Sequence, residues 1–169
     1  MLGARGAPAQ EAATPFFNSF KAFCADTGAQ AENVKAAVLA AGGTPHDPPT
    51  KSAETPFPMQ TSLWDVKANG EALVVSAGHA SSADGRTMID CVISGAAADD
   101  ASVAALERWA GVPASPGANA RFAYYLFEDR DGGHSVLRNT SEAEGRSWRL
   151  TLIRAPGVAS AELMHLLGR

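Results

Sequence analysis

From residue 62 onward, most of the chain consists of short runs in which apolar residues recur at every second position. Asn69-Gly70 separates the first run from the second, and Asp84-Gly85 separates the second from the third. Both dipeptides favour tight hairpin turns. A second set of three runs follows residue 120 and contains the turn sequence DRDGG. The pattern predicts two three-stranded meanders and therefore one antiparallel sheet of about six strands.

Helical patterns lie before, between and after these two meanders. The segments 14–24 and 29–43 carry apolar residues at helical spacing, as do 99–111 between the meanders and 159–167 after them. The predicted order is therefore α-α-β-β-β-α-β-β-β-α. This order is typical of a single α+β domain over residues 14–169, with its helices on one face of the sheet.

The segment 44–60 contains five prolines and can form neither a helix nor a central strand. We expect an extended strap on the surface, anchored by Phe57 and Met59, and a functional loop is the alternative. The runs LVV and FAYYLF are apolar on both strand faces. The strap or a partner subunit should therefore cover part of the second sheet face, and a homodimer through a sheet face stays open.

Residues 1–13 are rich in alanine and glycine, and we expect them to be disordered. Ala7-Pro8-Ala9 has the small-x-small form of a signal-peptidase site, which would make this segment the remnant of a signal peptide. The alternative is an ordinary flexible terminus. The first interpretation places the protein in the periplasm or outside the cell, and the second leaves it in the cytoplasm.

The two cysteines bear on the same question. Cys24 shares a helical stripe with three phenylalanines, and Cys91 lies on the apolar side of the strand TMIDCVIS. Both sulfurs should therefore point into the core, where a disulfide would suit an exported protein. Two buried, reduced cysteines are the alternative. A catalytic thiol is disfavoured because an apolar site raises the pKa of a cysteine and limits access to it.

Charge and motifs exclude several functional classes. The net charge is −4 without a basic stripe, which argues against a nucleic-acid partner. No apolar run reaches the ~18–20 residues of a membrane span. The chain has no G-x-S-x-G, no dinucleotide-binding glycine motif and no phosphate loop. We therefore expect no nucleotide or other cofactor and no metal, and a partner that is a protein or a small molecule.

Two hairpin tips carry the residues best suited to chemistry. His79 and Asp84 lie at the first tip, and Asp131 and His134 lie at the second, near Asp129. If the fold brought both tips together, these side chains could bind a divalent metal or transfer protons. Polar residues are, however, ordinary at hairpin tips.

A second candidate surface is cationic. Arg149 alternates away from the apolar residues of the last strand, and Arg138 in the preceding strand could join it in a patch for an anionic partner. More often such arginines form a solvated sheet face.

Two functional hypotheses follow from the sequence. The first is an exported, non-catalytic module that binds a macromolecule or small ligand through its sheet face or its proline-rich strap. The second is an enzyme that uses both hairpin tips, which requires the two histidines to lie within about 7 Å of a shared carboxylate.

Overall fold

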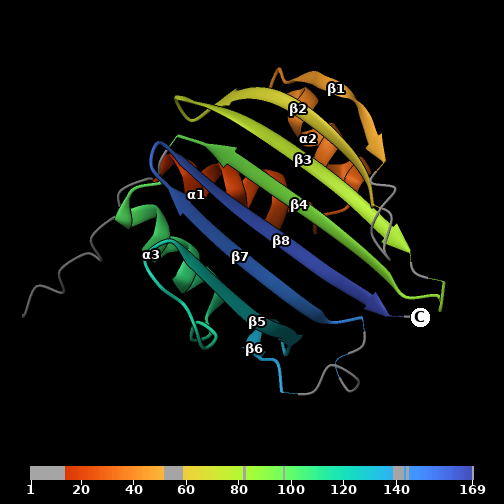
Figure 1. Cartoon of the computed structure of the whole chain (residues 1–169), viewed down its shortest axis with the longest axis vertical. Helices are drawn as coiled ribbons and strands as arrows, with labels where there is room; N and C mark the ends of the chain where they lie inside the picture. The colour runs from red at the N-terminus through yellow and green to blue at the C-terminus, as the bar shows by residue number, and fades with distance from the viewer. Residues whose placement is uncertain are drawn as a thin grey trace, which may run out of the picture.

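The computed structural model describes residues 14–51, 59–81, 83–96, 98–138, 143 and 145–168. Its centre is one antiparallel sheet of eight strands in the order β1-β2-β3-β4-β8-β7-β5-β6. The helices pack behind this sheet, on one face (Figure 1). The strands are β1 Thr44–Lys51, β2 Met59–Ala68, β3 Glu71–Ser81, β4 Thr87–Gly95, β5 Phe122–Arg130, β6 Gly133–Val136, β7 Ser147–Ala155 and β8 Val158–Gly168. The helices are α1 Pro15–Phe20, which continues as the π-helix η1 Lys21–Ala25, then α2 Ala31–Ala40 and α3 Asp100–Ala110. The α+β class and the antiparallel sheet were predicted correctly.

The first helix forms where its pattern predicts. Thr14 is the N-cap residue and Pro15 occupies the first turn, where its missing N–H costs nothing. Phe16 and Phe20 are buried on α1, and Phe23 and Cys24 are buried on η1, so the stripe faces the sheet. In the described part of the chain, no helix is long and apolar enough to span a membrane.

Helix α3 has a capping residue at each end. The Asp99 carboxylate accepts a hydrogen bond of 2.7 Å from the backbone N–H of Ser102. Hydrogen bonding from the Ser102 side chain, together with this bond from its backbone N–H, lowers the pKa of Asp99. At the other end, Gly111 adopts φ 68°, a left-handed conformation that glycine tolerates without strain.

Replacing Asp99 with alanine should therefore lower the free energy of unfolding by about 1 kcal/mol, since one N–H at the start of α3 loses its acceptor. The matched control is Asp100→Ala, which removes a pairing with Arg154 at 2.9 Å on an exposed carboxylate and should cost less than about 0.5 kcal/mol. Urea denaturation of both variants measures the difference. Equal losses would show that the cap contributes nothing specific.

The predicted last helix is wrong, because residues 158–168 form the strand β8. Pro156 and Gly157 make a turn that folds β8 back along β7, and β8 also pairs with β4. The interior position explains the error: β8 has apolar residues on both faces, so its pattern lacks the clean alternation of a half-exposed strand. Ala159, Ala161 and Leu163 alternate into the core.

Two further predictions about the sheet need correction. It has eight strands and not about six, because β8 and β1 were not counted. β1 occupies the first half of the proline-rich segment, where an edge position with register shifts tolerates the missing N–H groups. The second meander is also wrong, since β7 pairs with β5 rather than with β6. The short strand β6 therefore forms the second edge of the sheet.

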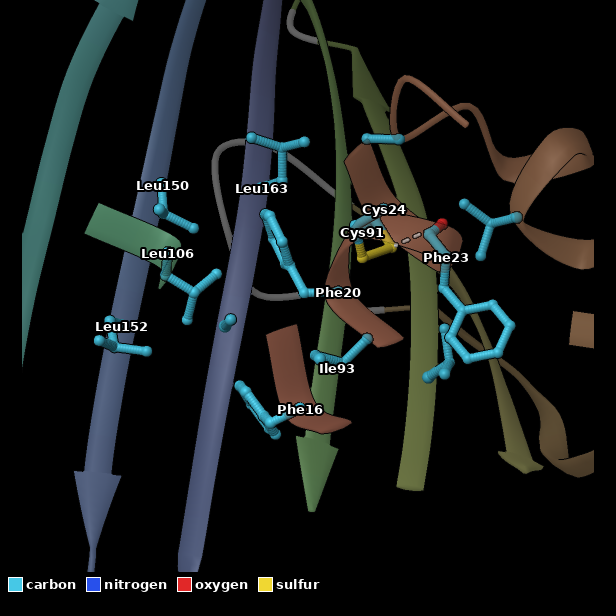
Figure 2. Packing of buried hydrophobic residues seen from close by; sticks show 14 of the residues in the cluster. Phe16, Phe20, Phe23, Cys24, Cys91, Ile93, Leu106, Leu150, Leu152 and Leu163 are labelled. Atoms are coloured by element: carbon cyan, nitrogen blue, oxygen red, sulfur yellow. Dashed lines mark hydrogen bonds between the residues drawn. A yellow bond between two sulfur atoms is a disulfide. The ribbon is translucent and has the colours of Figure 1, made fainter. Parts of the chain in front are cut away.

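The core lies between the helices and the inner face of the sheet, and the predicted disulfide is part of it. Cys24 on η1 and Cys91 on β4 are bonded, with their Cα atoms 5.4 Å apart. The bond lies among Phe20, Phe23 and the aliphatic side chains of β4 and β8 (Figure 2). The disulfide prediction is confirmed. The predictions for residues 1–13 and for Phe57 fall outside the described residues.

Candidate functional site

The two hairpin tips singled out in the sequence lie at the same end of the sheet but do not meet. β3 and β5 run in the same direction, so the turns that follow them share that end. Three strands, β4, β8 and β7, lie between them. At ~4.8 Å per strand, the two tips are about 19 Å apart. The structure therefore does not bring His79 and Asp84 together with Asp131 and His134.

The residues at each tip have local partners instead. The Asp84 carboxylate lies 3.1 Å from the Arg86 guanidinium. His134 packs against Trp109 and Phe127, and its Nδ1 lies 3.0 Å from the Trp109 carbonyl oxygen. Asp131 adopts φ 52° and serves the turn. Among the described residues, no three His, Cys, Asp or Glu side chains are grouped to hold a metal ion.

The sheet face opposite the helices, here called the outer face, carries a second group of polar side chains. No described helix lies over it (Figure 1). The outer-face residues on the central strands are Met88, Asp90, Val92 and Ser94 on β4, Ser160, Glu162 and Met164 on β8, and Ser147, Arg149, Thr151 and Ile153 on β7. Asp90, Arg149, Thr151 and Glu162 form what we call the outer-face cluster.

The register of the strands places these four residues side by side. Asp90 is paired with Met164, which is paired with Arg149 in the next strand. Glu162 is paired with Thr151, one step along the same strands. The Arg149 guanidinium donates a hydrogen bond of 3.3 Å to the Glu162 carboxylate. Arg149 therefore neutralises Glu162, and Asp90 has no ion-pair partner of this kind among the described residues.

Several polar atoms of the cluster are buried without a partner. Asp90 is 6% exposed and Thr151 is 8% exposed, although both lie on the outer face. Asp90 Oδ1, Arg149 Nε and Thr151 Oγ1 have no hydrogen-bond partner within the described part of the chain. Leaving a buried polar group unpaired costs about 1–3 kcal/mol. Three such atoms, one on β4 and two on β7 across the intervening strand β8, therefore make this part of the face suited to a ligand that supplies the missing bonds.

The protonation of Asp90 reflects the same environment. Burial raises the pKa of Asp90 to about 6, and the negative charge of Glu162 adds to the increase. Hydrogen bonds from the backbone N–H groups of Gly78 and Asp90, together with the charge of Arg149, act in the opposite direction. Carboxyl groups with a pKa raised in this way are found most often at functional sites.

Sequence reasoning found only one member of this cluster. Arg149 was predicted on the face opposite the core and lies there. Arg138 lies after the end of β6 and is exposed, and Met59 begins β2 on the outer face. Asp90, Thr151 and Glu162 were missed. An aspartate between Ile89 and Cys91 was a usable signal, since charged residues are rare inside apolar strands.

A further cavity lies elsewhere. It has a volume of about 550 Å³ and lies beside the β2–β3 hairpin, where Thr44, Asp65, Lys67 and Ser94 contribute to its wall. It is open, and no unpaired buried side-chain atom of the described residues belongs to its lining. No family model, curated protein or solved structure matches this chain.

Proposed function

We propose that this protein is an exported, non-catalytic binding protein that holds a ligand on the outer face of its sheet, at the outer-face cluster. The bound group would satisfy Asp90, Arg149 and Thr151 while the surrounding apolar side chains exclude water. Ligand sites generally combine apolar walls with a small number of polar groups that fix orientation.

One observation carries this proposal: the buried carboxyl group of Asp90 has no ion-pair partner in the part of the chain that the structure describes, and it lies on a face that no described helix covers. The site lowers the stability of the fold, because Asp90 is desolvated at neutral pH without full compensation. Such an arrangement has no structural purpose that the described contacts reveal. A ligand that pairs with Asp90 would recover part of this cost on binding.

Export is the second part of the proposal. The Cys24–Cys91 disulfide supports it, since disulfides persist mainly in oxidising compartments. The small-x-small sequence at Ala7-Pro8-Ala9 is consistent with a processed signal peptide. The alternative function, an enzyme at the two hairpin tips, has less support because three strands separate the tips.

A fragment screen by amide correlation NMR, on the disulfide-bonded protein, tests the binding role. We expect the fragments that bind to shift the amides of β4, β7 and β8 around Asp90 and Thr151. Thr151→Val should weaken them about tenfold, since a lost hydrogen bond to a ligand is worth about 1.4 kcal/mol. Thr44→Val, on the edge strand and in the wall of the open cavity, is the matched control and should change nothing.

Fragments that gather at the open cavity or at a hairpin tip would contradict the proposal. The same NMR experiment also shows whether the natural partner is a second copy of the chain. In that case the outer-face amides would shift with protein concentration alone, without any added fragment.

A further inference from the structure

The Asp90 carboxylate lies over a glycine of the neighbouring strand. Gly78 on β3 is paired with Asp90 on β4, and a Cβ atom on Gly78 would lie 2.5 Å from Asp90 Oδ1. The same Cβ would lie 3.0 Å from Met59 Sδ. The carboxylate oxygen therefore occupies space that any other residue at position 78 would fill, and the Met59 side chain lies beside it.

This oxygen is buried but unpaired. Asp90 is 6% exposed, and its Oδ1 has no hydrogen-bond partner within the described part of the chain. A buried acceptor of this kind calls for a donor. Met59 is only half-buried, and a methionine side chain is unbranched with three rotatable bonds. A ligand that donates an N–H bond can therefore reach the oxygen by displacing one flexible side chain.

The charges around Asp90 favour a cation. Glu162 is the diagonal neighbour of Asp90, since it lies two residues from Met164, the partner of Asp90 on β8. Diagonal neighbours on one sheet face are about 7–8 Å apart, so the two carboxylates share one field. Arg149 pairs with Glu162, and the three ionised side chains keep one net negative charge. The described outer-face residues of β2 and β3 at this level carry no charge; they are Met59, Thr61, Leu63, Ser76, Gly78 and Ala80.

The rest of the surroundings favour an organic cation over a metal ion. Among the described residues, no three His, Cys, Asp or Glu side chains are grouped to hold a metal. The neighbours of Asp90 on the outer face are instead apolar, with Met88 and Val92 on its own strand and Met164 beside it on β8. An ammonium group on a carbon chain provides the N–H donor, the positive charge and an apolar body in one molecule.

We propose that the outer-face cluster binds a small organic amine, whose ammonium group donates a hydrogen bond to Asp90 Oδ1 and whose carbon chain crosses β8. The inference rests on the proposed function and names the class of ligand for the same site. Thr151 lies on β7, two strand spacings or ~10 Å across the sheet from the strand of Asp90. Its unpaired Oγ1 would receive a neutral polar group, such as a hydroxyl, at the far end of the chain.

The experiment compares probes of equal length and different charge. Hexylamine, hexanol and hexanoate are titrated into the disulfide-bonded protein at pH ~8, with amide NMR signals of β4 and β8 as the readout. Hexylammonium should bind at least about tenfold more tightly than hexanol, because its bond to Asp90 is charge-assisted, and hexanoate should bind most weakly. Aminohexanol should bind several-fold more tightly than hexylamine, and Thr151→Val should remove that gain.

Variants and pH identify the carboxylate. Asp90→Asn keeps the shape of the side chain but removes the charge, and it should weaken hexylammonium binding at least about tenfold. Glu162→Gln should weaken it by a smaller factor, because Glu162 acts only through its field. Glu32→Gln, at an exposed carboxylate on α2, is the matched control and should leave the affinity unchanged. Urea unfolding of each variant shows whether the fold is retained.

The pH profile separates a role in binding from a role in the fold. An alkylammonium group stays protonated well above neutral pH, as a lysine side chain does. Its affinity should therefore fall as the pH drops through about 6, where Asp90 takes up a proton and loses its charge. The Asp90→Asn variant should show no such fall.

Hexylammonium that binds no more tightly than hexanol would overturn the inference. So would an Asp90→Asn variant that binds it as tightly as the original protein, or hexanoate as the tightest probe, which would assign the site to anions at Arg149. If fragments still bind to the outer face in any of these cases, only the class of ligand is wrong. If neither amines nor fragments bind to this face, the proposed function fails with it.

Discussion

Reduction of the Cys24–Cys91 disulfide should lower the free energy of unfolding by about 4 kcal/mol. The bond joins residues separated by 67 positions, so its loss releases a long loop in the unfolded chain. The stabilities of folded domains are only about 5–15 kcal/mol, which makes this a large fraction of the total. The reduced protein should therefore unfold at a much lower denaturant concentration.

Guanidinium denaturation of the oxidised and the reduced protein measures this difference. Cys24→Ala/Cys91→Ala serves as the matched variant, since it removes the bond permanently and leaves no buried thiols. The slope of the free energy against denaturant should also increase, because an uncrosslinked unfolded chain exposes more surface. Identical midpoints before and after reduction would mean that packing alone holds η1 against β4.

Asp90→Asn should stabilise the protein at neutral pH by up to about 3 kcal/mol, because the folded pKa of about 6 lies roughly two units above the ordinary value of 3.8. The amide has the shape of the carboxyl group but carries no charge to desolvate. Proteins that bear such costs at functional sites are often stabilised when the site is removed.

The pH dependence gives this prediction its sign. A raised pKa means that the folded state binds the Asp90 proton more tightly than the unfolded state does. The stabilisation from the protonated carboxyl is fully present below pH ~4 and is lost as the pH rises through about 6. The variant and the original protein should therefore be equally stable at about pH 4, and the variant should be more stable at pH ~8.

Urea denaturation across this pH range is the measurement. Glu32→Gln, at an exposed carboxylate on α2, is the control and should stay within about 0.5 kcal/mol of the original protein at every pH. A variant at Asp90 that is less stable at every pH would show that the carboxylate supports the fold. In that event the argument for a ligand at this position would lose its energetic basis.

The sequence predicts the local elements of this fold better than it predicts their arrangement. The stripe of Phe16, Phe20 and Cys24 and the turns at Asn69-Gly70 and Asp84-Gly85 carry their information within a few residues. The place of β8 depends on β4 and β7, and no local pattern records which strands will be its neighbours. Because apolar residues lie on both faces of β8, its sequence pattern resembled that of a helix.

The candidate site was hidden for the same reason. Asp90, Arg149 and Glu162 are distant in the sequence and meet only because β4, β8 and β7 are adjacent. The wrong assignment of 159–167 as a helix removed both Glu162 and Met164 from the sheet. The sequence left open whether the two hairpin tips lie at the same end of the sheet, and the separation of their histidines depends on the number of strands between them.

The central position of β8 also has a consequence for how this protein is made. β8 follows the other strands in the chain, yet it is the strand that joins β1–β4 to β5–β7. During synthesis, the two halves of the sheet cannot unite until the segment 158–168 has emerged. Joining them requires contacts between residues far apart in sequence, which makes folding slow. The pairing of β4 with β8 should therefore be a late step of folding, after the local hairpins have formed.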